Sequence, residues 1–174
     1  TGLRASELRG LTWPNVDFDK AVIHVRQRAD RYRAIGQPKS EAGERDVPLP
    51  PTLAAVLKAW KKEVTRSDLD LCFPNLSGQT EAHRPICAAY EAAQINAGVA
   101  VATGEKDRKG QPVQKAKYTG LHSLRHFYAS WCINRKIDGG LELPPKVVQE
   151  RLGHATINMT LDVYGHLFPS ADNG

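Results

Sequence analysis

The stretch LGHATINMTLDVYGHLF, residues 152–168, places a histidine just before a predicted helix and a tyrosine at the end of that helix. A glycine stops the preceding helical pattern, so His154 stands directly after a helix end. In the next helix Ile157, Leu161 and Tyr164 recur at helical spacing. This pattern leaves two interpretations of Tyr164 open: a tyrosine at the edge of the core, or a phenol that acts together with the histidine.

The helical pattern over residues 122–136 predicts one packed face and one polar face. At about 100° per residue, the apolar arc gathers Leu124, Phe127, Tyr128 and Trp131. The opposite face carries His122, Arg125 and His126. We interpret that face either as an ordinary solvated surface or as a site where histidine and arginine act together.

A metal site is the alternative use of these histidines. His122 and His126 have the i, i+4 spacing that can bind zinc, and His154 offers a third ligand. However, no glutamate of an HExxH motif accompanies them, and Arg125 would put a cation beside the metal. We therefore expect no metal, and we expect His126 and His166 to be structural hydrogen-bond partners or packing residues.

The chain opens with TGLRASEL, residues 1–8, in which an arginine follows a glycine turn. Glu7 stands three residues after Arg4, where it can hold the guanidinium group. Such pairs are also common on protein surfaces, so this feature alone does not indicate a function.

Two segments carry the excess positive charge. The chain has 24 Lys and Arg against 19 Asp and Glu, a net charge of +5. Residues 20–45 carry a net +4, residues 106–125 a net +5, and the remainder is negative. If folding brings the two segments together, they form a basic face suited to a polyanion such as nucleic acid. The alternative is two solvated loops that happen to be basic.

Length and composition restrict the class of protein. The 174 residues, 41% of them hydrophobic, suit one domain with a real core. No apolar run approaches the ~20 residues that cross a bilayer. Cys72, Cys87 and Cys132 fit no zinc spacing, and so sparse a set indicates a reducing compartment.

The remaining pattern predicts an α+β fold, mainly α, with one small three-stranded antiparallel sheet. We expect its strands as a meander at residues 21–26, 31–38 and 45–49, and further helices at 51–66, 83–97, 144–152 and 156–164. Residues 99–119 are rich in lysine and glycine, and we expect a long exposed loop or flap there. Pro169 and a polar tail are expected to end the chain.

Four stretches together resemble the catalytic domain of the tyrosine recombinases, also called phage integrases. They are TGLRASEL (1–8), PKSEAGERDVPLP (38–50), LHSLRH (121–126) and LGHATINMTLDVYGHLF (152–168), in the family's order and at family-like spacing. The resemblance implies the DNA breaking-rejoining fold. It also implies a catalytic set of Arg4, Lys39, His122, Arg125, His154 and Tyr164, with Glu7 in support.

The activity implied by this resemblance is DNA strand transfer without ATP, metal or another cofactor. The Tyr164 oxygen would attack a phosphodiester, forming a 3′-phosphotyrosine and releasing a 5′-hydroxyl. Arg4, Arg125 and His154 would bind the nonbridging oxygens, where negative charge develops. Lys39 would protonate the leaving oxygen, and His122 would accept or organise the phenolic proton.

The resemblance gives the basic segments a role at DNA, as contacts to the phosphate backbone. In the first segment the expected contacts are Arg26, Arg28, Arg31, Arg33 and Arg45. In the second they are Lys106, Arg108, Lys109, Lys115 and Lys117. Such contacts add affinity and salt dependence but little sequence information.

Further expectations concern partners and domains. The partner would be double-stranded DNA and not a membrane. The protein would be a monomer in the absence of DNA, and the full-length protein would form a homotetramer on paired sites. Accessory DNA-bending proteins could take part. The location would be the cytoplasm, for a bacterial or phage-encoded protein. We expect residues 1–174 to be a catalytic-domain fragment, without the N-terminal DNA-clamping domain and without the helix that precedes Arg4. Apolar surface would then be exposed where that helix lies.

Two alternatives share much of this pattern. A relaxing enzyme of the type IB topoisomerase kind uses the same tyrosine chemistry without exchanging partner strands. A DNA-binding module that has lost catalysis would keep the basic segments, although the complete catalytic set argues against it.

Overall fold

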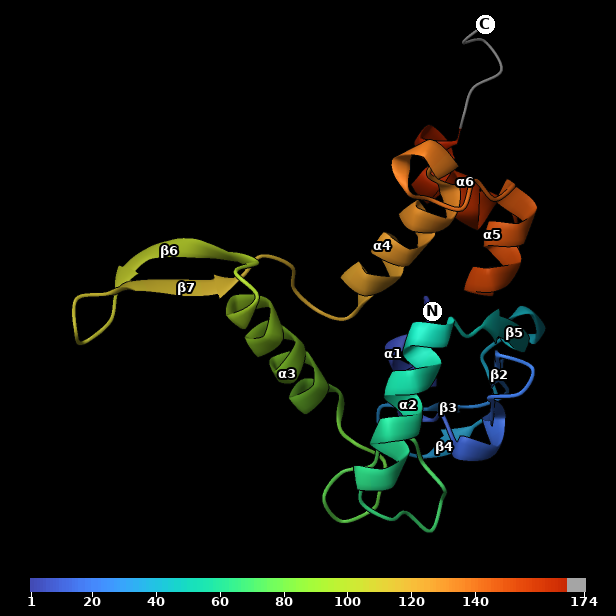
Figure 1. Ribbon diagram of the computed structural model, residues 1–174, viewed down its shortest axis with the longest axis horizontal. Coiled ribbons are helices and arrows are strands. Elements are labelled where there is room, and N and C mark those ends of the chain that lie inside the picture. The colour runs from blue at the N-terminus through green and yellow to red at the C-terminus, as the bar shows by residue number, and fades with distance from the viewer. Residues whose placement is uncertain (169–174) are drawn as a thin grey trace, which may run out of the picture.

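A computed structural model describes residues 1–168, and the predicted chain end at Pro169 and the polar tail lie outside them. Six α-helices occur in these residues: α1 (Ala5–Arg9), α2 (Pro51–Glu63), α3 (His83–Asn96), α4 (His122–Ile133), α5 (Pro145–Leu152) and α6 (Asn158–Tyr164). The strands are β1 (Val16–Asp17), β2 (Val22–Val25), β3 (Arg28–Ala29), β4 (Ile35–Gly36), β5 (Arg45–Pro48), β6 (Ala100–Lys106) and β7 (Pro112–Ala116). Helices dominate and the sheets are small, which confirms the predicted fold class (Figure 1).

The three-stranded antiparallel sheet has the order β1-β2-β5, which differs from the predicted meander. The segment predicted as a strand at 31–38 contributes only β4, and β4 pairs with β3 in a separate sheet. The reason is a local turn: the Asp30 carboxylate accepts the backbone N–H groups of Tyr32 and Ala34 at 2.7 and 2.9 Å. The turn folds β4 back onto β3, and β1, for which we predicted no strand, takes the other edge of β2.

One hydrophobic cluster joins this sheet to α2. Ile23 is 2% exposed and pairs in register with the buried Val47 of β5. Leu57 of α2 and Leu11, which follows α1, pack into the same cluster. Leu3 packs against the same cluster, so the cluster connects the sheet with the first residues of the chain.

A second cluster joins α4, α5 and α6 and corrects our prediction for the packed face of α4. Ala129 and Cys132, both fully buried, meet Leu152 of α5. Of the arc that we predicted to pack, Tyr128 is buried in this cluster and Trp131 packs against it, whereas Leu124 and Phe127 are 47% and 71% exposed. The two small side chains let α5 approach closely, so α5 covers their side of α4 and leaves Leu124 and Phe127 open.

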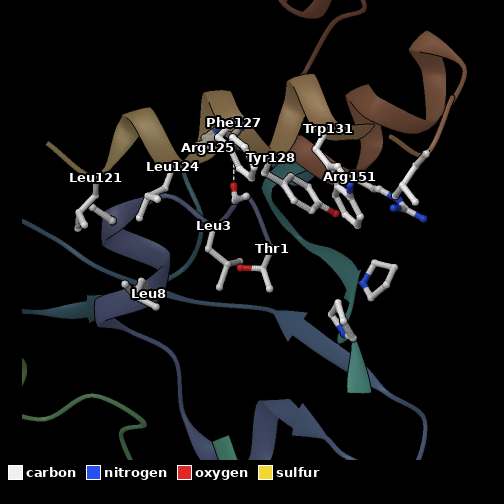
Figure 2. A pocket seen from close by; sticks show the side chains of 15 residues that line it. Thr1, Leu3, Leu8, Leu121, Leu124, Arg125, Phe127, Tyr128, Trp131 and Arg151 are labelled. Carbon is white, nitrogen blue, oxygen red and sulfur yellow. Dashed lines mark hydrogen bonds between the residues drawn. The ribbon is translucent and has the colours of Figure 1, made fainter. Parts of the chain in front are cut away.

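The uncovered arc of α4 forms one wall of an open apolar pocket. Leu124 and Phe127 line it together with Thr1, Leu3 and Leu8 from the first residues of the chain (Figure 2). Apolar surface is therefore exposed beside these first residues.

Residues 99–119 form a hairpin, so our prediction of a loop is wrong, although the segment is largely exposed as expected. Strands β6 and β7 pair from Ala100↔Ala116 to Lys106↔Pro112. The Asp107 carboxylate closes the turn by accepting the N–H groups of Lys109 and Gln111. The hairpin projects away from the remaining elements, next to α3 (Figure 1). The many lysines and glycines in this segment obscure the apolar/polar alternation from which a strand is predicted.

Gly153 ends α5 as predicted and lies where no side chain fits. Its φ is +64°, a left-handed conformation that favours glycine, and a Cβ there would lie 2.8 Å from the Ala42 carbonyl oxygen and 2.9 Å from Arg45 Nη1. The residue therefore allows α5 to end directly against the segment that leads into β5.

Gly153→Ala should destabilise the protein more than Gly139→Ala. Both glycines have positive φ, which costs an alanine about 1–2 kcal/mol, but a Cβ at Gly139 meets nothing within 4 Å. The added clash at Gly153 should cost at least about 1 kcal/mol more, measured by urea unfolding. Equal losses for the two variants would show that the close approach at Gly153 does not matter.

Candidate active site

Five of the six predicted catalytic residues gather where the start of the chain meets α4, α5 and α6. Arg4 donates to the Gly153 carbonyl at 2.9 Å, and Arg125 donates to the Gly2 and Leu152 carbonyls. His122, His154 and Tyr164 complete this cluster. Residues far apart in the sequence thus face one site.

Arg125 is the most buried cation of the site. It is 2% exposed, and its two Nη atoms donate to the Gly2 and Leu152 carbonyls at 2.6 and 2.5 Å. Burial lowers its pKa to about 10, with further lowering by the charges of Arg4 and Arg45, so it stays charged at neutral pH. Arg125 therefore ties the start of the chain to the end of α5.

Glu7 is a buried carboxylate held by two arginines. Arg4 donates to it through its backbone N–H and Nη1, each at 2.8 Å, which confirms the predicted pairing. Arg45 donates through Nη1 at 3.0 Å and Nη2 at 2.9 Å. Burial alone would raise the pKa of Glu7, but the hydrogen bonds and charge of Arg45, with the hydrogen bonds of Arg4, lower it below its usual value. Glu7 is thus an anion that orients both guanidinium groups.

This arrangement corrects our expectation for Arg45. We expected a DNA backbone contact, but the residue is 8% exposed and its guanidinium is bound to Glu7 and to the Arg151 carbonyl. The alternation of β5 turns this residue toward the core, together with Val47. Arg45 therefore supports the site from inside.

His154 is neutral at neutral pH. Its pKa is lowered to about 4, first by burial and then by the charges of Arg125 and Arg4. Its Nδ1 lies 2.9 Å from the hydroxyl oxygen of Thr160, a fully buried residue of α6. That bond orients the ring and leaves Nε2 as the nitrogen that can meet a ligand.

The Tyr164 side chain is 5% exposed and makes one contact that the sequence did not reveal. Its hydroxyl lies 2.7 Å from Nδ1 of His126, a residue for which we predicted only a structural role. Burial raises the pKa of Tyr164, while the Arg125 charge acts in the opposite direction. The same-face spacing of His122 and His126 was a signal for a shared site, but it did not indicate which histidine meets the tyrosine.

His122 contacts the His126 ring of this pair. Its ring meets that of His126 edge-on, with the centroids 4.7 Å apart. Burial lowers its pKa, and so do the neighbouring His126, Arg125 and Arg4. His122 thus lies against His126 and close to the positive charges of Arg125 and Arg4.

Lys39 is not brought into the cluster. It lies exposed between β4 and the 3₁₀ helix Glu41–Gly43, and none of the hydrogen bonds or ion pairs among residues 1–168 involves it. Its position on an exposed segment leaves the ammonium group free to move.

The basic segments differ in how far their side chains are engaged. Arg26 donates to the Asp46 carboxylate, and the Arg31 guanidinium stacks over the Tyr32 ring. Arg28 is partly buried and Arg33 is exposed. The five cations of the hairpin are all exposed: Lys106, Arg108, Lys109, Lys115 and Lys117.

The described part of the chain holds neither a metal-ligand cluster nor a membrane-spanning helix. Among residues 1–168, no group of three His, Cys, Asp or Glu side chains lies close enough to hold a metal ion. None of the helices in this range is long and apolar enough to cross a membrane.

Glu7→Gln should cost about 3–5 kcal/mol of stability at pH 7, because Arg45 would be left buried without its counter-charge. The exposed Glu63→Gln should change stability by no more than about 0.5 kcal/mol. Since folding lowers the pKa of Glu7, its contribution is complete above the unfolded value of 4.5 and is lost as the pH falls through the folded value. Urea unfolding at pH 7 and in acid should show the gap between wild type and Glu7→Gln closing in acid; a gap independent of pH would contradict this ion-pair description.

Curated proteins are similar to this chain in sequence over nearly its whole length. The chain is 29% identical over 183 residues to a XerC-like tyrosine recombinase of Caldanaerobacter subterraneus, an alignment that covers 97% of this chain and 44% of the relative. It is 31% identical over 173 residues to the transposase of transposon Tn916 from Enterococcus faecalis, covering 95% of this chain and 40% of the relative. The chain thus spans less than half the length of these curated relatives.

Solved structures match the fold. The Tn1549 transposon integrase in complex with transposon right end DNA superposes with a TM-score of 0.70 at 23% identity, covering 99% of this chain and 52% of that one. The XerH recombinase bound to its difH substrate matches with a TM-score of 0.61 at 21% identity, covering 95% of this chain and 39% of that one. The family model described as "Phage integrase family" matches residues 1–170. This chain therefore belongs to the phage integrase family, the tyrosine recombinases.

Proposed function

We propose that this chain is the catalytic part of a site-specific recombinase that cleaves and rejoins DNA through a 3′-phosphotyrosine, in integration or excision. One observation carries the proposal: Arg4, Arg125, His154 and Tyr164, from four separate parts of the chain, face one electropositive site. A phosphodiester is the anion that such a site suits, and a tyrosine is the nucleophile at hand.

The two arginines keep donors available for a phosphate. Each Nη atom carries two N–H groups, and the bonds to Glu7 and to backbone carbonyls use one per atom. The remaining N–H groups of Arg4 and Arg125 can bind the nonbridging oxygens as negative charge develops. Because Glu7 and the carbonyls fix the guanidinium planes in advance, little reorganisation is needed during the reaction.

His154 adds a neutral donor to this set. If the Thr160 hydroxyl donates to Nδ1, Nε2 carries the ring proton and can donate it to a nonbridging oxygen. Since its pKa is about 4, the ring needs no protonation to act in this way at pH 7.

Lys39 is the proposed acid for the leaving 5′-oxygen. Its exposed segment allows the ammonium to move onto DNA that occupies the site, and a flexible cation suits this task. No ATP is required, because the phosphotyrosine bond stores the energy of the cleaved phosphodiester. We propose that the two arginines supply the charge stabilisation that a metal would otherwise give.

Double-stranded DNA is the proposed partner, held partly by backbone contacts from the exposed cations of the two basic segments. Relatives of this fold have been solved with DNA. We further propose a cytoplasmic, bacterial or phage-encoded protein. Within a longer enzyme that also has a DNA-clamping domain, it would be monomeric alone and tetrameric on paired sites, with accessory DNA-bending proteins.

Tyr164→Phe should abolish covalent attachment to DNA. Nicked duplexes of randomised sequence should trap wild-type protein as an adduct that resists detergent, because the short strand beyond the nick diffuses away before rejoining. The captured strands, once sequenced, would also reveal the preferred site. An adduct that persists in Tyr164→Phe would reject the nucleophile, and binding without any wild-type adduct would favour a module that has lost catalysis.

Replacing Lys106, Lys115 and Lys117 with glutamine should weaken DNA binding and flatten its salt dependence. Each lost phosphate contact should lower the slope of log affinity against log salt by about 0.9. A matched control removes three cations from α2, at Lys58, Lys61 and Lys62, and should leave the slope unchanged. Equal changes in both variants would mean that overall charge, not the hairpin, determines binding.

A further inference from the structure

The hydroxyl of Tyr164 must lose its proton when it bonds to phosphorus, and the structure supplies one partner for it. Nδ1 of His126 lies 2.7 Å from the Tyr164 oxygen, and the two rings are tilted at 59° with their centroids 5.7 Å apart. Among residues 1–168, no other side-chain hydrogen bond reaches this hydroxyl. Any account of the attack therefore has to include His126.

The hydrogen bond joins a phenol that keeps its proton to a ring nitrogen whose role the tautomer sets. Burial raises the pKa of Tyr164, so at neutral pH the phenol has a proton to donate. The direction that serves the attack has the Tyr164 hydroxyl donating to Nδ1 of His126, and Nε2 then carries the ring proton. This tautomer presents a lone pair to the proton that has to leave.

Tyr164 and His126 differ in solvent exposure, and this difference suits the transfer of a proton from the tyrosine to water through the histidine. Tyr164 is buried, whereas the His126 side chain is exposed to solvent. A proton received at Nδ1 can therefore be balanced by release from Nε2 to water. His122, which we expected to serve as acceptor or organiser, touches the ring of His126 and makes no hydrogen bond to Tyr164.

We propose that His126 is a catalytic residue that accepts the phenolic proton of Tyr164 during strand cleavage, a role that rests on the proposed function. The Tyr164 oxygen forms its bond to phosphorus while the bond from phosphorus to the 5′-oxygen breaks. The phenolic proton moves to Nδ1 of His126, and the leaving 5′-oxygen takes a proton from Lys39. Rejoining reverses these transfers, so His126 returns the proton to Tyr164.

The charges around the pair make this transfer depend on bound DNA. The charge of Arg125 acts on Tyr164, and the His122 ring touches that of His126. Arg4 and His154 belong to the same cluster of charged and titratable groups. A phosphodiester bound between Arg4 and Arg125 would add negative charge and stabilise the imidazolium that forms.

The first test needs no DNA. In a long-range ¹H–¹⁵N NMR spectrum of the protein at about pH 8.5, His126 should show a protonated Nε2 and an unprotonated Nδ1. Tyr164→Phe should shift the Nδ1 resonance of His126, because the donor is gone, and should leave that of the distant His83 unchanged. A protonated Nδ1 on His126 would overturn the proposal, whether or not the protein cleaves DNA.

The second test separates proton transfer from positioning. His126→Asn offers an oxygen that can accept the same hydrogen bond but cannot take the proton, so the rate of adduct formation on nicked DNA should fall by about 10²–10⁴-fold. The remaining rate should rise up to about tenfold per pH unit, because phenolate must then form from solvent. Added imidazole should partly restore His126→Ala, since the position is exposed.

Controls separate the outcomes. His83→Asn on α3 should cleave like wild type, and His126→Asn should keep the unfolding midpoint and DNA affinity of wild type. A His126→Asn protein with the rate and pH profile of wild type would overturn the proton-acceptor role. Absence of an adduct with wild type would count against the proposed function instead, and the NMR test would still decide the tautomer.

Discussion

A single buried carboxylate holds the site together. Glu7 binds Arg4, which caps the start of its own helix, and Arg45 from β5; these arginines in turn donate to the Gly153 and Arg151 carbonyls at the end of α5. The first helix, the sheet and α5 thus meet at one anion. Without that charge, the guanidinium groups of Arg4 and Arg45 would face each other in a poorly solvated space, which is why the geometry of these donors depends on Glu7.

Around this anion the protein builds a surplus of positive charge. Burial, together with the charges of Arg125 and Arg4, lowers the pKa of His154 and of His122. A site with such a surplus of positive charge suits an anionic group, which is the electrostatic basis of the function proposed above.

Local patterns predicted the elements with clear start and stop signals. Prolines at the first turns of α2 and α5, and Gly153 at the end of α5, marked those helices closely. The 31–38 strand failed because Asp30 closes a local turn, and the 99–119 hairpin was missed because lysines and glycines masked its alternation. Helical periodicity also misjudged α4, since it cannot tell which neighbour will cover which side of a helix.

The sequence by itself determined which groups are available: two arginines, a lysine, histidines and a tyrosine in four stretches that resemble one family. It also determined the pairing of Arg4 with Glu7, because helical spacing alone brings them together. Only the tertiary structure decided that Arg45 is buried on Glu7 and that His126, not His122, meets Tyr164. Those contacts join residues on different elements, and the packing of whole helices and strands sets them, so no local spacing contains them.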